Sequence, residues 1–185
     1  MPSEKDLISR SQSGDRAAFS ELILQYEDRI FRLAQKVCAR APAEAEGVHQ
    51  DTFVTALEKI QQFENRSALG TWLYRIAANL CFMRLRAKSR TMTVPLDSDD
   101  LMEDPSPGPA SVAARAELQR AVVSALEALP SDDRMVVTLR DIHGLSAEET
   151  SKILKLSIPA VKSRLHRGRL YLREKLRLFK PAIAP

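Results

Sequence analysis

Apolar side chains recur every three or four residues through the first half of the chain, which is the spacing of amphipathic helices. The pattern predicts a short helix near 3–10, a long helix over 15–37, and further helices over 43–60 and 69–83. Pro42 separates the second helix from the third, because the residue before a proline disfavours the helical conformation. Together these helices can enclose one hydrophobic core.

The same spacing returns in the second half of the chain and predicts four more helices. Each has a start signal whose side chain can accept a hydrogen bond from an exposed backbone N–H. These signals are Ser111, the run Ser131-Asp132-Asp133, Ser146 with Glu149, and Ser157. Pro130 and Gly144 end the first two of these helices. No alternating strand pattern or hairpin signal occurs, so the sequence predicts an all-α fold.

The helical pattern stops between residues 91 and 110, where four prolines stand among five acidic residues. Such a segment cannot bury enough apolar surface to offset the entropy lost on ordering. We interpret 91–110 as a flexible acidic linker. The sequence therefore predicts two small helical domains, at 1–90 and 111–181, joined by this linker.

Charge divides along the chain in the same way. The 185 residues include 28 basic and 24 acidic side chains, for a net charge of +4. Residues 1–90 carry +3, residues 91–115 carry −4 and residues 116–185 carry +5. Within the last part, residues 152–180 hold ten basic side chains and one acid. Both helical parts therefore suit an anionic partner such as nucleic acid.

The rest of the composition argues against several classes of protein. Cys38 and Cys81 lie far apart with no CxxC motif, so we interpret them as small buried residues and expect neither a disulfide nor a metal site. The first residues are too polar for a signal peptide, and no apolar stretch approaches the roughly 20 residues of a membrane helix. We expect a cytoplasmic protein without a cofactor or a membrane span.

The last two predicted helices form the clearest motif. A short capped helix, a turn of about three residues and a longer helix with a basic face are the features of a helix-turn-helix, whose second helix enters the DNA major groove. The side chains opposite the apolar stripe can contact base edges or phosphates. They are Lys162, Ser163, His166, Arg167 and Arg173. The alternative is a solvated cationic face that closes a small bundle.

A second basic stripe lies on the predicted helix that begins at Leu69. At 100° per residue, one side of this helix carries Arg75, Asn79, Phe82, Arg86 and Arg90, with Trp72 at its edge. Cations interleaved with aromatic rings suit an unpaired strand, and the polar loop 63–68 before the helix offers contacts to a flipped base. Trp72 has a commoner alternative as a core residue.

Four longer motifs stand in order along the chain. They are Gln50-Asp51-Thr52-Phe53; Thr71-Trp72-Leu73-Tyr74-Arg75-Ile76-Ala77 with Asn79; Leu139-Arg140-Asp141-Ile142-His143-Gly144-Leu145-Ser146; and Val161-Lys162-Ser163-Arg164-Leu165-His166-Arg167. Together they resemble the extracytoplasmic-function (ECF, group 4) sigma factors of bacterial RNA polymerase. The resemblance covers nearly the whole chain in that family's order of region 2, linker and region 4.

The resemblance implies a transcription initiation factor with no catalytic residue of its own. Region 2, at 1–90, would recognise and melt the promoter minus-10 element and bind the polymerase clamp. Region 4, at 111–181, would read the minus-35 element and sit on the polymerase flap. The partners it implies are core RNA polymerase, promoter DNA and an anti-sigma factor.

The family's motifs also assign roles to single positions. The minus-35 contacts are Lys162, Ser163, His166 and Arg167, with Ser157 at the cap of the same helix. The minus-10 contacts are Asn79 and the loop with Phe63, Arg66 and Ser67, to which the basic stripe adds Trp72, Arg75 and Arg86. The clamp contacts are Glu46, Gln50 and Asp51.

Four positions depart from the family pattern. Gly47 stands where Asp is usual, which removes an anionic contact and costs the helix roughly 1 kcal/mol. Lys155 fills a turn position that is usually Gly, so it must adopt a left-handed conformation or use another turn. Leu69 replaces a usual Phe, and Met83 replaces Asp or Asn.

Other classes of function explain less of the sequence. An enzyme needs a catalytic constellation, and no phosphate-binding loop or nucleophile elbow is present. Glu46 and His49 have the spacing of one half of a di-iron site, but the other ligands are missing, so we interpret His49 as a surface residue. The main alternative is a DNA-binding activator with a C-terminal helix-turn-helix and an unrelated N-terminal helical domain. A protein-interaction bundle is a further alternative.

Overall fold

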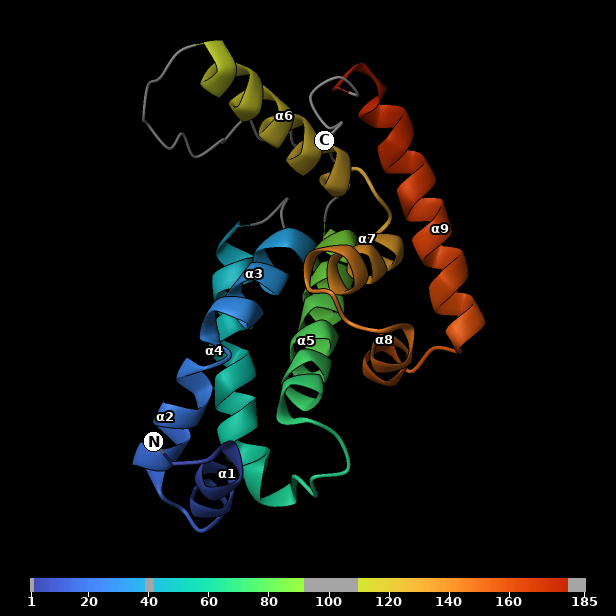
Figure 1. The fold of residues 1–185 in the computed structure, drawn as a ribbon. Coiled ribbons are helices and arrows are strands. Elements are labelled where there is room, and N and C mark those ends of the chain that lie inside the picture. Colours follow the sequence, from blue (N-terminus) through green and yellow to red (C-terminus); the bar gives the residue numbers. More distant parts are fainter. Residues whose placement is uncertain (1, 39–41, 92–109, 180–185) are drawn as a thin grey trace.

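The computed structural model describes residues 2–38, 42–91 and 110–179, and these residues form helices joined by turns (Figure 1). No strand occurs among them, so the predicted all-α fold is confirmed. The predicted linker falls mostly on 92–109, outside the described residues. The elements are α1 (Glu4–Gln12), α2 (Arg16–Leu24), α3 (Glu27–Val37), α4 (Pro42–Lys59), η1 (Ile60–Gln62), α5 (Leu69–Thr91), α6 (Ala110–Glu127), α7 (Ser131–Val137), η2 (Thr138–Ile142), α8 (Ala147–Leu154), α9 (Ile158–Lys175) and η3 (Arg177–Phe179).

The single helix predicted over 15–37 is wrong, because the structure has α2 and α3 with a break at Gln25 and Tyr26. The Tyr26 N–H donates to the Ile23 carbonyl, three residues back rather than four, at 2.8 Å. The Tyr26 hydroxyl donates to Glu4 in α1 at 2.6 Å. The periodic pattern could not reveal the break, because both helices bury their apolar residues in the same core.

The first core lies among α1 to α5 and contains large side chains that are almost fully buried. Examples are Leu7, Leu22, Leu33, Val48 and Leu73. Both cysteines are free thiols buried in this core, as predicted. Outside this core, the exposed faces of α4 and α5 carry several candidate functional residues of the first half, namely Glu46, Gln50, Asn79 and Arg86.

Helix starts in the second half agree with the sequence in part. Ser146 forms the predicted capping box with Glu149, and Ser157 caps α9 by accepting from the Ala160 N–H at 3.3 Å. Ser111 lies inside α6, which begins at Ala110, so it is not a cap. The cap of α7 is Pro130, so the run that begins with Ser131 forms the first helical turn instead.

The turn between α8 and α9 contains Lys155 at φ 53°, which confirms the left-handed alternative for this residue. The buried stripe of α9 then rests on α7. Gly168 allows the close approach, because a Cβ on this residue would lie 2.5 Å from Cγ2 of Val137. The opposite face of α9 is therefore directed to solvent.

The two halves of the chain share buried contacts, which the sequence did not predict. Met135, Leu139 and Ile153 from the second half belong to the same hydrophobic cluster as the core of α1 to α5. The Tyr74 hydroxyl is hydrogen-bonded to Nδ1 of His143 at 3.0 Å. In addition, Nη1 of the buried Arg134 donates to the Val37 carbonyl at the end of α3, at 2.9 Å. The halves therefore lie against each other (Figure 1).

Candidate nucleic-acid interface

The exposed face of α9 carries the residues that the sequence assigned to the minus-35 element. Lys162, Ser163, His166 and Arg167 are all exposed, and Ser157 is exposed at the start of the helix. Val161 and Leu165, between them in sequence, are buried. The structure therefore brings these polar side chains together on one face, in the orientation that a groove-binding helix requires.

Arg167 is held in place by a carboxylate from α7. Its Nη2 lies 2.8 Å from Oδ1 of Asp133, and its Nε lies 3.2 Å from Oδ2 of the same residue. Asp133 is only 6% exposed and raises the pKa of Arg167. Nη1 of Arg167 also donates to Ser163 at 3.3 Å. These contacts order the Arg167 guanidinium on the exposed face of α9.

Arg164 makes a similar pair with Asp132, at 2.8 Å. Neither Asp132 nor Asp133 was predicted as a partner of α9, because the run Ser131-Asp132-Asp133 was interpreted as a helix cap. The only hint in the sequence is that one capping side chain suffices at a helix start, whereas this run offers two further acids. Pairs separated by about thirty residues have no local spacing rule.

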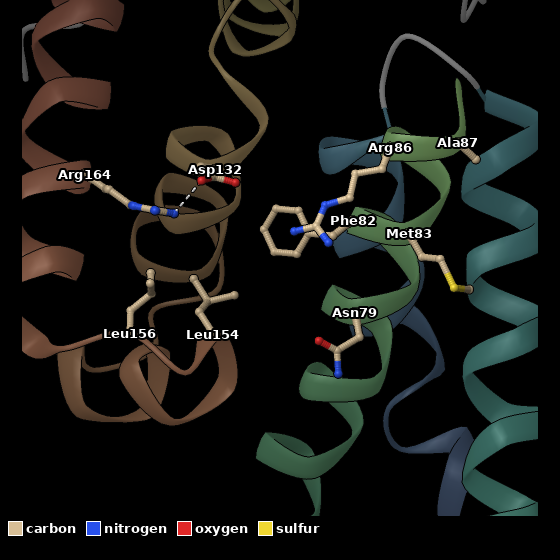
Figure 2. A pocket seen from close by; sticks show the side chains of 9 residues that line it. All are labelled: Asn79, Phe82, Met83, Arg86, Ala87, Asp132, Leu154, Leu156 and Arg164. Atoms are coloured by element: carbon tan, nitrogen blue, oxygen red, sulfur yellow. Dashed lines mark ion pairs between the residues drawn. The ribbon is translucent and has the colours of Figure 1, made fainter. Parts of the chain in front are cut away.

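Beside the contacts between the two halves, a cleft of about 670 Å³ opens between α5 and the helix-turn-helix half (Figure 2). Figure 2 shows Phe82 and Arg86 directed from α5 toward the side formed by Asp132, Leu154, Leu156 and Arg164. Asn79, Met83 and Ala87 complete the lining. The cleft combines one aromatic ring and several aliphatic side chains with two arginines and an amide, which are groups that bind unstacked bases and phosphates. It also contains the carboxylate of Asp132, which pairs with Arg164.

The loop predicted to hold a flipped base has a buried root and an exposed tip. Phe63 is 5% exposed, and its ring packs against Trp72 with centroids 5.2 Å apart. The Phe63 side chain therefore supports the loop from inside. Arg66 is exposed and pairs with Glu64 at 2.6 Å, and Ser67 is half-buried.

Two further residues of the basic stripe, Trp72 and Arg75, are not fully exposed. Trp72 is half-buried, so its exposure fits neither a fully buried core residue nor a fully exposed nucleic-acid contact. Arg75 is half-buried, and its Nε is a buried atom without a hydrogen-bond partner. The side chain of Arg90 lies outside the described part of the chain. The structure therefore gathers Asn79, Phe82 and Arg86 at the cleft.

The candidate clamp contacts lie on α4. Glu46 and Gln50 are exposed, and Asp51 is half-exposed. Arg84 from α5 reaches across α4, where Nη1 lies 2.8 Å from Glu44 and Nη2 pairs with Asp51. Glu44 and Asp51 raise the pKa of Arg84.

Gly47 gives Arg84 its path across α4. A Cβ at position 47 would overlap the Arg84 guanidinium, with Cζ only 2.8 Å away. Gly47 therefore removes the carboxylate that is usual in the family at this position and leaves space for the Arg84 guanidinium.

The interpretation of His49 as a surface residue is wrong. His49 is half-buried between Phe31 and Phe53, with ring centroids 5.2 Å away on each side. Among the described residues, no group of three or more His, Cys, Asp or Glu side chains could hold a metal ion. In the same part of the chain, no helix is both long enough and apolar enough to span a bilayer.

The fold and its exposed basic faces define a helical DNA-binding protein. Two family models match the chain: "Sigma-70 region 2" over residues 22–91 and "Sigma-70, region 4" over residues 119–172. The RNA polymerase sigma-H factor of Pseudomonas aeruginosa is 33% identical over 177 residues, covering 90% of each chain. The ECF sigma factor SigW of Bacillus subtilis is 32% identical, covering 94% of this chain and 96% of its own. The chain belongs to the ECF sigma factors of the sigma-70 family, which is not a class of enzymes.

Solved structures agree with this assignment. The sigma factor RpoE of Bartonella quintana, in complex with the anti-sigma factor NepR, has a TM-score of 0.72 and 25% identity, covering 86% of this chain and 96% of its own. CnrH in complex with the cytosolic domain of CnrY has a TM-score of 0.67 and 28% identity, covering 93% of this chain and 96% of its own. The family predicted from the sequence motifs is confirmed, and the activator alternative is not favoured.

Proposed function

We propose that the two halves of this sigma factor divide the promoter between them. Residues 111–181 read the minus-35 element through α9, while residues 1–90 recognise and help to melt the minus-10 element and bind the polymerase clamp. Residues 91–110 join the two. The observation that carries this proposal is the arrangement of α9, whose apolar stripe is buried on α7 while Lys162, Ser163, His166 and Arg167 face solvent together.

At the minus-35 element, Lys162 and His166 supply donors for base edges or phosphates. Arg167 supplies a guanidinium whose orientation Asp133 already fixes, so less side-chain entropy is lost on binding. Ser163 and Ser157 stand beside them as smaller hydrogen-bonding groups.

At the minus-10 element, the unpaired strand lies along the cleft side of α5. Asn79 and Arg86 offer an amide and a cation there, and Arg66 and Ser67 offer polar groups from the loop. Trp72 and Arg75, both half-buried on α5, add a ring and a cation to this set, and Phe63 packs against Trp72. Polymerase carries out the chemistry, so none of these residues is catalytic.

The same exposed surfaces suggest where the protein partners bind. We assign the clamp contact to Glu46, Gln50 and Asp51 on α4, and the flap contact to residues 111–181. An anti-sigma factor is a further partner, because the similar sigma factor RpoE was solved in complex with the anti-sigma factor NepR. The place of action is the cytoplasm, where core polymerase is found.

Transcription reconstituted with core RNA polymerase tests the proposal. The chain is expected to direct initiation at a defined promoter while showing little specific affinity for duplex DNA alone. Lys162→Ala is expected to lower promoter use without weakening core binding, whereas Lys5→Ala, an exposed lysine on α1, leaves it unchanged. Asn79→Ala is expected to reduce permanganate reactivity of the minus-10 region. Tight sequence-specific binding without polymerase, and no effect on initiation with it, would refute the proposal.

A further inference from the structure

Helix α1 contacts the start of the loop that precedes α5. Its last residue, Gln12, is half-buried, and Nε2 donates to two backbone carbonyls, one at the first residue of η1 and one just after its last residue. These are Ile60 at 3.1 Å and Phe63 at 2.7 Å. The Phe63 N–H also bonds back to the Ile60 carbonyl at 3.0 Å. One side-chain amide therefore fixes the backbone where loop 63–68 begins.

The other end of α1 contacts Tyr26, whose ring lies against the first turn of α5, just after the loop. Glu4, the first residue of α1, accepts the Tyr26 hydroxyl at 2.6 Å. The Tyr26 ring lies against Gly70, since a Cβ there would stand 3.0 Å from Cε1 of the ring. Burial and Glu4 raise the pKa of Tyr26, which favours the protonated hydroxyl that donates to Glu4. Gly70 is the second residue of α5, and Leu69 alone separates it from loop 63–68.

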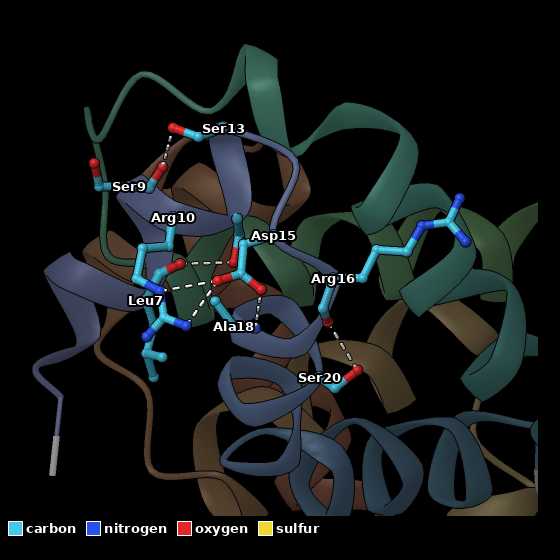
Figure 3. Close-up of polar contacts among 9 residues, drawn as sticks. Leu7, Ser9, Arg10, Ser13, Asp15, Arg16, Ala18 and Ser20 are labelled. Atoms are coloured by element: carbon cyan, nitrogen blue, oxygen red, sulfur yellow. Dashed lines mark hydrogen bonds and ion pairs between the residues drawn. The ribbon is translucent and has the colours of Figure 1, made fainter.

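The helix that joins these two contacts is itself held firmly. Ser3 forms a capping box with Asp6, and Leu7 and Ile8 are buried in the core. Figure 3 shows Arg10 paired with Asp15, the cap of α2, at 2.7 Å. The α1–α2 corner is therefore closed by hydrogen bonds on its surface and by apolar burial beneath.

We infer that α1 is a brace that sets the position of loop 63–68 for minus-10 recognition, with Gln12 as its principal positioning residue. The inference rests on the proposed role of that loop in binding the minus-10 strand. Gln12 touches no DNA in this account. It acts by holding the Phe63 backbone while the Phe63 ring rests on Trp72, so that the exposed tip with Arg66 is ordered before the strand arrives. A loop ordered in advance loses less entropy on binding.

Substitution of Gln12 tests the brace. Gln12→Met keeps the size of the side chain but cannot donate, whereas Gln12→Lys restores a donor of similar reach. With holoenzyme on a promoter mapped with the wild-type protein, Gln12→Met is expected to slow open-complex formation about tenfold, the factor expected for about 1.4 kcal/mol of lost hydrogen bonding. Gln12→Lys is expected to recover most of this rate, and core binding is expected to stay unchanged in both.

A spectroscopic measurement on the free chain separates positioning from unfolding. Trp72 is the single tryptophan and contacts Phe63, so its emission reports the root of the loop. Gln12→Met is expected to increase acrylamide quenching of Trp72 while far-UV circular dichroism stays constant, and Gln12→Lys is expected to restore the wild-type value. The matched control is Gln25→Met, at an exposed glutamine in the α2–α3 turn.

The outcomes distinguish the brace from the function on which it rests. If Arg66→Ala and Asn79→Ala slow open-complex formation but Gln12→Met behaves like Gln25→Met, the brace is refuted and the minus-10 assignment stands. If Arg66→Ala and Asn79→Ala are both without effect, the minus-10 assignment is refuted, and the brace is refuted with it because it rests on that assignment. If Gln12→Lys is as slow as Gln12→Met, hydrogen-bond donation by residue 12 is not the cause, and the brace is refuted as well.

Discussion

Replacing Gly47 with alanine should have a different effect on stability depending on whether Arg84 is present. Alanine favours the interior of a helix over glycine by about 1 kcal/mol. In the wild-type background, however, its Cβ would occupy the position of the Arg84 guanidinium. Arg84 would then have to leave the carboxylates of Glu44 and Asp51.

The size of the effect follows from the exposure of these groups. The side chain of Arg84 is 27% exposed, and those of Glu44 and Asp51 are 39% and 50% exposed. Ion pairs at this exposure contribute about 0.5 kcal/mol each, so losing both cancels the helix gain of about 1 kcal/mol. Gly47→Ala is therefore expected to leave the wild-type stability unchanged and to raise that of Arg84→Ala by about 1 kcal/mol.

Urea unfolding of the four proteins in this double-mutant cycle measures the coupling between the two positions. The expected coupling energy is about 1 kcal/mol, and it should decrease in 1 M salt because partly exposed ion pairs are screened. If Gly47→Ala stabilises both backgrounds equally, Arg84 does not depend on the glycine, and our account of this departure from the family pattern is wrong.

Three other substitutions test contacts in the second half of the chain. Gly168→Ala should lower the free energy of unfolding by about 1 kcal/mol, because the clash with Val137 outweighs the gain in helix propensity; a higher Tm would contradict this. Lys155→Gly should raise the free energy of unfolding by about 1 kcal/mol, because glycine adopts the left-handed conformation without the steric cost of a Cβ. Urea unfolding measures this change too. Burial lowers the pKa of His143 from 6.5 to about 4, so the unfolded chain takes up a proton first and stability should fall as the pH is lowered from about 6.5 to 4. His143→Gln should flatten this dependence, and an unchanged slope would assign it to other groups.

The sequence could predict those parts of the fold that depend on neighbours along the chain. The box of Ser146 with Glu149, the cap at Ser157 and the left-handed alternative for Lys155 all rest on contacts within a few residues. The break before α3 could not be predicted, because it depends on contacts of Tyr26 with Glu4 and Gly70 that are distant in sequence.

The same limit applies to the candidate site. Periodicity placed Lys162 and Arg167 on one exposed face, since a helix fixes which residues share a side. It could not reveal that Asp133 orders Arg167 or that Gln12 holds the Phe63 backbone, because each of these contacts joins separate helices. It also could not show that the Phe63 ring packs inward, since a lone aromatic residue in a polar loop has no periodic partner.

The contacts between the two halves have a consequence for apparent affinity. Any partner that needs α5 apart from α7 and α8 must supply the free energy to expose Met135 and Ile153 and to break the Tyr74–His143 hydrogen bond. Its measured dissociation constant is then the intrinsic value divided by the fraction of chains already open, and each 1.4 kcal/mol of closure weakens apparent binding about tenfold. Substitutions that loosen this contact therefore strengthen such binding, even though they destabilise the isolated protein.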